Sequence, residues 1–144
     1  MDIVLMYAVT QPYGILVHTQ LIKKMPNWFE AVFVSPSHHR VHHASNVVYL
    51  DKNLGMCLII WDKIFGTFQE ELDSEPVKYG LTKPVKQTNN PFKLVFHEWA
   101  ALGSDLGKKT SLPIKIKYLF MPPGWSHDGS SKTARELRKE LEPK

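Results

Sequence analysis

Histidine is the residue type in this chain that offers the most specific chemistry, and its distribution is uneven. Four of the seven histidines of the 144-residue sequence fall within residues 38–43. Ser35 and Pro36 precede them. This pair favours a helix start, because a serine oxygen caps free N–H groups and a proline ring pre-sets φ at the first helical position. The sequence therefore predicts a helix that begins at Pro36 and carries the histidines.

Three of these histidines fall on one face of the predicted helix. His39, His42 and His43 stand at i, i+3 and i+4, and Asn46 follows on the same face one turn later. Each neutral imidazole offers a nitrogen lone pair to a transition metal, so this spacing indicates a metal site. The alternative is a run of surface histidines, as in an expression tag. This run is internal and interrupted by two other residues, which favours metal binding.

The residues around this face resemble the fatty acid hydroxylase (sterol desaturase) superfamily, whose last histidine box reads H-x-x-H-H. Here the box is residues 39–43, His-Arg-Val-His-His. The phrases at 35–43 (S-P-S-H-H-R-V-H-H), 51–55 (D-K-N-x-G) and 58–68 (L-I-I-W-D-K-I-F-G-T-F) are similar to the alkylglycerol monooxygenase-like branch. A looser likeness covers about residues 13–126.

The resemblance implies an integral membrane oxidoreductase with a non-haem di-iron centre held by histidines. Such enzymes use O₂ to hydroxylate, desaturate or cleave lipids, and this branch takes electrons from tetrahydrobiopterin. The metal ligands implied here are His18, His39, His42 and His43. The implied location is an integral or peripheral membrane protein with its histidine site on the cytoplasmic side. That membrane is the endoplasmic reticulum in a eukaryote and the inner membrane in a bacterium.

Earlier histidine boxes of the superfamily, H-x-x-x-H and a first H-x-x-H-H, are absent from the sequence. We therefore expect the C-terminal part of a membrane di-iron monooxygenase that acts on lipids. Its other ligands would come from upstream boxes of the same longer chain or from another subunit. The alternative is a catalytically incomplete relative that binds metal weakly or not at all. A third reading, a soluble zinc hydrolase with a His₃ site and a metal-bound water, lacks a convincing carboxylate near the box.

Polar residues near the box each have two interpretations. Asn46 and Asp51 either orient the ligating imidazoles by accepting their free N–H groups, or they cap and turn the chain. His38, the remaining histidine of the run, is a candidate for the same orienting role.

Four further side chains are weighed as parts of the site. Glu70 and Glu71 carry carboxylates that ligate iron in principle, but a solvated acidic connection is the favoured interpretation. Trp61 and Phe65 stand four residues apart on a predicted helix. They either pack together or line an apolar lipid cavity.

Composition is that of an ordinary soluble protein, with 43% apolar and 22% charged residues. The net charge of +4 suits an anionic lipid surface or a nucleic acid. No nucleic-acid-binding motif accompanies the basic residues, so we expect no nucleic acid partner. The single cysteine excludes an internal disulfide and fits a reducing compartment.

The predicted fold is mainly α: a membrane-associated helical bundle fragment with polar loops and a basic C-terminal tail. Residues 1–68 are expected to form the C-terminal part of a fatty acid hydroxylase domain, and residues 69–144 a cytoplasmic-side extension. Beside the histidine helix, helices are predicted in 28–33, 54–65, 91–103 and after Thr133, where Thr133 and Glu136 form a capping box. Residues 1–17 have two interpretations. The resemblance implies the end of a membrane helix whose beginning is missing, which is the favoured one, and the alternative is a buried helix broken at Pro12. Residues 108–117 are expected to be a strand or an extended basic segment.

Overall fold

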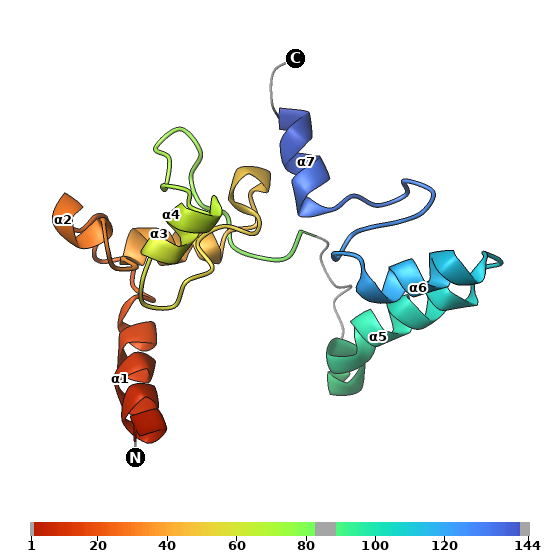
Figure 1. Cartoon of the computed structure of the whole chain (residues 1–144), viewed down its shortest axis with the longest axis horizontal. Coiled ribbons are helices and arrows are strands. Elements are labelled where there is room, and N and C mark those ends of the chain that lie inside the picture. Colours follow the sequence, from red (N-terminus) through yellow and green to blue (C-terminus); the bar gives the residue numbers. More distant parts are fainter. Residues whose placement is uncertain (1, 83–88, 142–144) are drawn as a thin grey trace. The chain divides into compact units, whose positions relative to one another are not determined.

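Helices make up the regular structure of the described chain. The computed structural model describes residues 2–82 and 89–141. The helices are α1 (Asp2–Leu16), α2 (Asn27–Glu30), α3 (Pro36–His42), the 3₁₀ helix η1 (Val47–Tyr49), α4 (Ile60–Phe65), α5 (Pro91–Gly107), α6 (Leu112–Phe120) and α7 (Ala134–Leu141) (Figure 1). In these ranges the only β pairing is two isolated antiparallel bridges, Phe33 with Leu58 and Ala44 with Tyr79. The predicted mainly α class is confirmed.

The chain divides into two compact units, Met1–Thr82 and Lys83–Lys144. All four expected metal ligands lie in the first unit. The sequence-based boundary at residue 68 concerned the extent of the hydroxylase domain, and it stays a prediction. Residues 69–82 are part of the first compact unit.

A small core holds the first unit together. Val41, Ala44 and Tyr49 form its buried apolar cluster, and Leu72 and Val77 pack against them. The Tyr49 hydroxyl donates to the Glu75 carbonyl at 2.7 Å and accepts from the Leu72 N–H at 2.9 Å. The core therefore joins the histidine helix to the segment after residue 68.

Asp62 determines the path of the loop before α4. The carboxylate is 2% exposed and accepts from the backbone N–H groups of Leu54 and Gly55 at 2.7 and 2.9 Å. These bonds hold residues 54–58 in a loop, so the predicted helix over 54–65 is wrong in its first half. The helix itself ends at Gly66, whose φ of 71° is left-handed and favours glycine.

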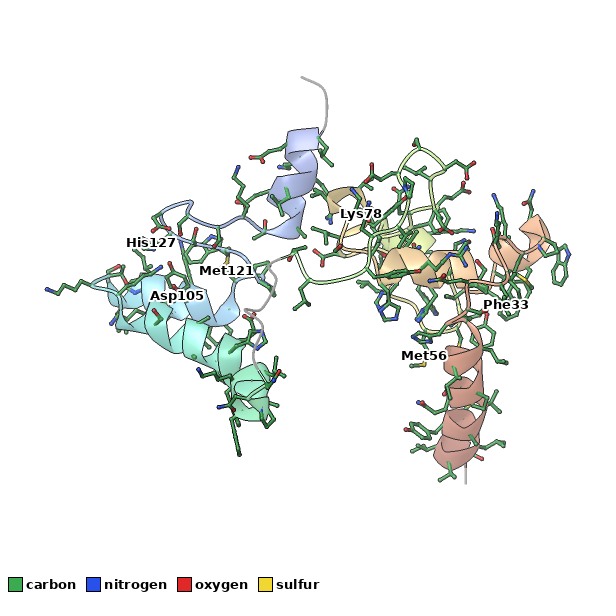
Figure 2. The ribbon with its side chains drawn as sticks, turned by 180° about the vertical axis from the view of Figure 1, so that it is seen from behind. Phe33, Met56, Lys78, Asp105, Met121 and His127 are labelled. Atoms are coloured by element: carbon green, nitrogen blue, oxygen red, sulfur yellow. The ribbon has the colours of Figure 1, made fainter. Side chains whose placement is uncertain are left out.

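The first helix runs without interruption from Asp2 to Leu16. Pro12 lies inside it, so the alternative of a buried helix broken at Pro12 is wrong. A proline removes one helical hydrogen bond, and here the helix continues through that position. Side chains of α1 project outward around the helix (Figure 2), and its described residues are not buried. None of the helices in the described ranges has the length and apolar character that a bilayer span requires.

The second unit contains α5, α6 and α7. The Asn90 side chain caps α5 by accepting from the Phe92 and Lys93 N–H groups, and α5 packs on α6. Residues 112–120 are helical, so the strand or extended segment expected over 108–117 is wrong there. Pro113, in the first turn of α6, favours a helix start.

Candidate metal centre

The histidine helix begins with a capping box in which histidine replaces the usual glutamate. Ser35 Oγ accepts from the His38 N–H at 3.4 Å, and His38 Nδ1 accepts from the Ser35 N–H at 3.3 Å. His38 is 2% exposed, and its Nε2 faces Glu30 Oε2 at 4.0 Å. The helix start predicted from Ser35 and Pro36 is therefore confirmed. It fixes the helix with His38 turned inward.

Three histidines from two segments converge at the exposed face of this helix. His39 and His43 lie one turn apart at α3, and His18 lies in the turn after α1, where its N–H donates to the Ile15 carbonyl. The Nε2 atoms of His18 and His39 are 2.9 Å apart, and each lies 3.0 Å from Nε2 of His43. Among the described residues, this is the one group of His, Cys, Asp and Glu side chains arranged to hold a metal ion.

Hydrogen bonding alone leaves this triangle of nitrogens unsatisfied. Each Nε2 either carries a proton and donates, or is bare and accepts. Among three mutually adjacent nitrogens, at least two are of the same kind and repel each other. A cation at the centre resolves this conflict, because it accepts a lone pair from all three nitrogens.

The tautomer of His18 supports the same conclusion. Its Nδ1 lies 2.6 Å from the Gly14 carbonyl oxygen, which can only accept a hydrogen bond. Nδ1 therefore carries the proton, and neutral His18 presents a bare Nε2 to the triangle. A backbone carbonyl that holds the other ring N–H in this way is the usual arrangement behind a metal-binding histidine.

The spacing of the nitrogens suits a shared ion. Metal–imidazole bonds of about 2.1 Å place two nitrogens of one ion about 3.0–3.4 Å apart, close to the observed 2.9–3.0 Å. Imidazole is a common ligand of iron as well as of zinc and copper. The three residues therefore fit the iron that the resemblance implies.

Two histidines of the triangle, His39 and His43, have a lowered pKa. The pKa of His39 is lowered to about 4, chiefly by burial and also by the neighbouring rings of His18, His43 and His42. Burial also lowers the pKa of His43, with smaller effects from His42 and His18. Neutral imidazole is the form that binds metal, so the site is prepared for an ion at neutral pH.

His42 lies beside the triangle rather than in it. Its ring stacks on that of His39 with centroids 5.5 Å apart and meets the His43 ring edge-on at 5.1 Å. The structure thus brings together three of the four predicted ligands and places the fourth next to them. The role of His42 as a ligand stays a prediction.

The residues expected to orient the rings have other contacts. The Asn46 amide donates to Glu75 Oε1 at 2.5 Å and to the Pro76 carbonyl, and its oxygen accepts from the Lys78 N–H. Asp51 lies in a turn with φ of 52°. His38 faces Ser35 and Glu30, as described above. Their orienting role stays a prediction, and the group seen to orient a ring is the Gly14 carbonyl, which the sequence did not indicate.

A cavity of about 510 Å³ opens beside the three nitrogens. Beyond His18, His39 and His43 it is lined by Val17, Thr19, Gln20, Arg40, Tyr79, Gly80 and Leu81. The lining is mostly apolar and contains no carboxylate, so the general base that a zinc hydrolase needs is missing from it. Trp61 and Phe65 do not line it, and they are 55% and 75% exposed on α4.

Two of the acidic residues after α4 bind side chains of the first unit. Glu71 pairs with Arg40, and Glu75 accepts from Asn46, so this stretch is more than the solvated connection that the sequence favoured. Neither Glu70 nor Glu71 joins the histidine group.

Comparison with known proteins gives consistent matches. Residues 1–67 match the sequence model of the fatty acid hydroxylase family. The chain is 40% identical over 123 residues to alkylglycerol monooxygenase from Homo sapiens (83% of this chain, 27% of that protein). It is 37% identical over 113 residues to the Xenopus tropicalis alkylglycerol monooxygenase (78% and 24%), and 31% identical over 78 residues to the ornithine lipid hydroxylase OlsE of Rhizobium tropici (54% and 23%).

The chain thus spans about a quarter of the length of these relatives. No solved structure matches it.

Proposed function

We propose that this chain, whose residues 1–67 match the sequence model of the fatty acid hydroxylase family, supplies the late histidine ligands of a lipid monooxygenase. The relatives are named for the oxygenation of alkylglycerols and the hydroxylation of ornithine lipids. The observation that carries the proposal is the convergence of the His18, His39 and His43 Nε2 atoms within 3.0 Å of one another.

Each residue of the triangle has a defined task in this proposal. His39 and His43 present lone pairs from consecutive turns of α3, and His18 presents a third from a separate segment. The Gly14 carbonyl keeps the proton of His18 on Nδ1 and so keeps its Nε2 available. Non-haem iron bound here would supply the activation of O₂.

His42 is proposed to serve a second iron. It is exposed beside the triangle, with its ring parallel to that of His39 within 26°. The remaining ligands of a di-iron centre would come from the rest of a longer protein or from another subunit, since the chain spans about a quarter of its relatives. Tetrahydrobiopterin is the proposed electron donor, by analogy with the family branch.

The cavity beside the triangle is the proposed place for the lipid. It has room for a segment of an acyl or alkyl chain, and the apolar part of its lining, with Val17 and Leu81, suits such a chain. Because the substrate is a lipid, we propose that the protein works at a membrane, with the histidines on the cytoplasmic side.

Metal analysis of the purified, untagged chain tests this function. We expect iron to bind in a 1:1 ratio to the chain with His18, His39 and His43 as ligands, and to be lost when His43 is replaced by alanine. A wild-type chain that binds no iron would favour the alternative of a catalytically incomplete relative. Stoichiometric zinc that excludes iron would contradict the proposal of an iron site.

A further inference from the structure

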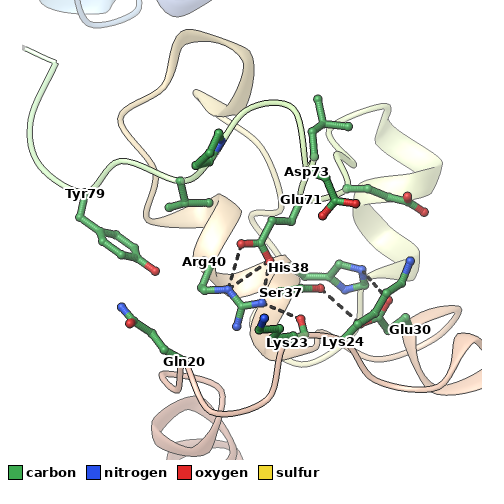
Figure 3. Close-up of a pocket in the computed structure, with 14 residues that line it drawn as sticks. Gln20, Lys23, Lys24, Glu30, Ser37, His38, Arg40, Glu71, Asp73 and Tyr79 are labelled. Atoms are coloured by element: carbon green, nitrogen blue, oxygen red, sulfur yellow. Dashed lines mark hydrogen bonds and ion pairs between the residues drawn. The ribbon is translucent and has the colours of Figure 1, made fainter.

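Arg40 lies inside the histidine box, between His39 and His42, and its guanidinium is fully engaged. Its Nε donates to both Glu71 carboxylate oxygens at 3.1 Å, and one terminal nitrogen donates to Glu71 Oε2 at 2.6 Å. The terminal nitrogens also donate to three backbone carbonyls, of Thr19 at 3.1 Å, Ile22 at 2.9 Å and Lys23 at 2.6 Å. Figure 3 shows Arg40 between Glu71 and Lys23.

The backbone that Arg40 binds is the one that follows His18. Residues 19–26 belong to no helix or strand, so regular backbone hydrogen bonds do not fix their path. One guanidinium satisfies three carbonyls of this segment. Since Arg40 belongs to α3, these bonds tie the His18 segment directly to the helix that carries His39 and His43.

Glu71 is itself held by the core. The neighbouring Leu72 N–H donates to the buried Tyr49 hydroxyl, and the Gln69 N–H donates to the side-chain oxygen of Asn53, which is 1% exposed. The carboxylate therefore presents both oxygens to Arg40 from a fixed backbone. A path of direct contacts runs from the core through Glu71 and Arg40 to the segment of His18.

We propose that Arg40 and Glu71 are positioning residues of the metal centre, which hold His18 in register with His39 and His43. This inference rests on the metal-binding part of the proposed function. It also extends the functional unit past residue 67, where the match to the family ends.

The geometry distinguishes this pair from an ordinary surface ion pair. The side chains are only 12% and 27% exposed, and the contact is bidentate. Exposed pairs contribute little, whereas a planar guanidinium in a fixed fork orients its partners. Lysine keeps the charge but offers one nitrogen, so it cannot reach the carboxylate and three carbonyls together.

Titration with Co²⁺, followed by its ligand-field absorption, tests the inference without any assay of activity. Arg40→Lys and Glu71→Gln are each expected to weaken Co²⁺ binding by about 10- to 100-fold, the usual effect of residues that orient metal ligands. The matched controls are Arg135→Lys and Glu70→Gln, which make the same chemical changes at exposed positions and should bind Co²⁺ like the wild type.

A double-mutant cycle separates positioning of His18 from a general structural role. In a His18→Ala background, Arg40→Lys and Glu71→Gln should cost no further affinity, because the ligand that they position is already gone. Equal losses in both backgrounds, or wild-type affinity in both single variants, would overturn the inference. Circular dichroism confirms folding, and Glu71→Gln, which leaves α3 unchanged, serves if Arg40→Lys does not fold.

The two proposals fail in different ways. If the wild-type chain binds neither Co²⁺ nor Fe²⁺, the metal site and this inference fall together. If the wild type binds and the variants bind equally well, only the role of Arg40 and Glu71 is refuted.

Discussion

The two compact units of the chain are stabilised in contrasting ways. In the first unit, buried polar side chains such as Asn46, Asn53 and Asp62 bind backbone groups between 7 and 32 residues away in the sequence. In the second unit α5, α6 and α7 have no buried residues, and Thr133 is the one buried residue among those described. Polar side-chain bonds in this unit join Asp128 to Ser130, Lys132 to Glu140 and Tyr118 to His127, and so span two to nine residues.

This difference shows what fixes the positions of side chains in a chain with a small core. Apolar packing alone fixes few of them, because the buried apolar cluster of the first unit has three members. Directional hydrogen bonds from buried side chains to distant backbone groups fix the others. The first unit can therefore hold three nitrogens in a defined triangle, whereas His97 and His127 of the second unit contact groups at most nine residues away.

The largest expected effect is on metal binding, and it should appear for a histidine of the first unit but not for one of the second. His39→Ala removes one of three ligands and should lower Co²⁺ affinity at least about 100-fold, more than the loss of an orienting residue. The control is His97→Ala in α5, since His97 contacts only near neighbours, the Leu94 carbonyl and Glu98. Titration with Co²⁺, followed by absorption, measures the affinity of both variants. Weakened binding in His97→Ala would show that the second unit shares the site.

The second prediction concerns stability. Asp62→Ala removes the acceptor of two backbone N–H groups and of the Thr67 hydroxyl, which donates at 2.6 Å. Because these donors lose their partner in a mostly buried place, we expect a loss of about 3 kcal/mol in the free energy of unfolding of the first unit. Urea denaturation measures it. Asp128→Ala, which removes the comparable contacts to Ser130, should leave the unfolding of the first unit unchanged.

How much of this was predictable from the sequence depends on the range of the interaction. The start of α3 follows from Ser35 and Pro36, and the start of α7 from Thr133 and Glu136, because cap and helix are adjacent in sequence. The shared face of His39 and His43 follows from helical periodicity. The fit of His18 to that face came from family resemblance, since an isolated histidine after an apolar run carries no local signal.

The long-range anchors were missed for a physical reason. Arg40 and Glu71 are 31 residues apart, and nothing in the local pattern selects Glu71 over the three other acidic residues at 70–75. The same holds for Asp62, whose bonds to Leu54 and Gly55 replaced the first half of a predicted helix. The sequence signal that could have indicated this pair was an arginine inside the histidine box together with the acidic stretch at 70–75.

The third prediction is a pH dependence of the metal-free first unit. Burial, together with the neighbouring rings of His18, His43 and His42, holds the folded pKa of His39 near 4, below the ordinary value of 6.5. As the pH falls below 6.5, His39 becomes protonated in the unfolded chain but stays unprotonated in the folded chain. The free energy of unfolding therefore decreases. Between pH 6.5 and 5 we expect a loss on the order of 1 kcal/mol, after solvent screening.

Thermal melts of the metal-free protein in this window measure the effect, before carboxylates begin to titrate. His39→Asn should flatten the dependence, and His97→Ala should retain it. A slope that His39→Asn leaves unchanged would assign the effect to the other histidines whose pKa is lowered by burial, His38 and His43.

The smallest expected effect lies in the second unit and tests whether a change there leaves the first unit unaffected. Thr133 Oγ1 accepts from the Glu136 N–H at 3.3 Å, and the Glu136 carboxylate accepts from the Thr133 N–H at 2.7 Å. Thr133→Ala should therefore cost about 1 kcal/mol, the usual value of an N-cap, and hydrogen exchange should speed up only in α7. Faster exchange in α3, or weaker Co²⁺ binding, would mean that the two units are coupled and that the contrast between them is wrong.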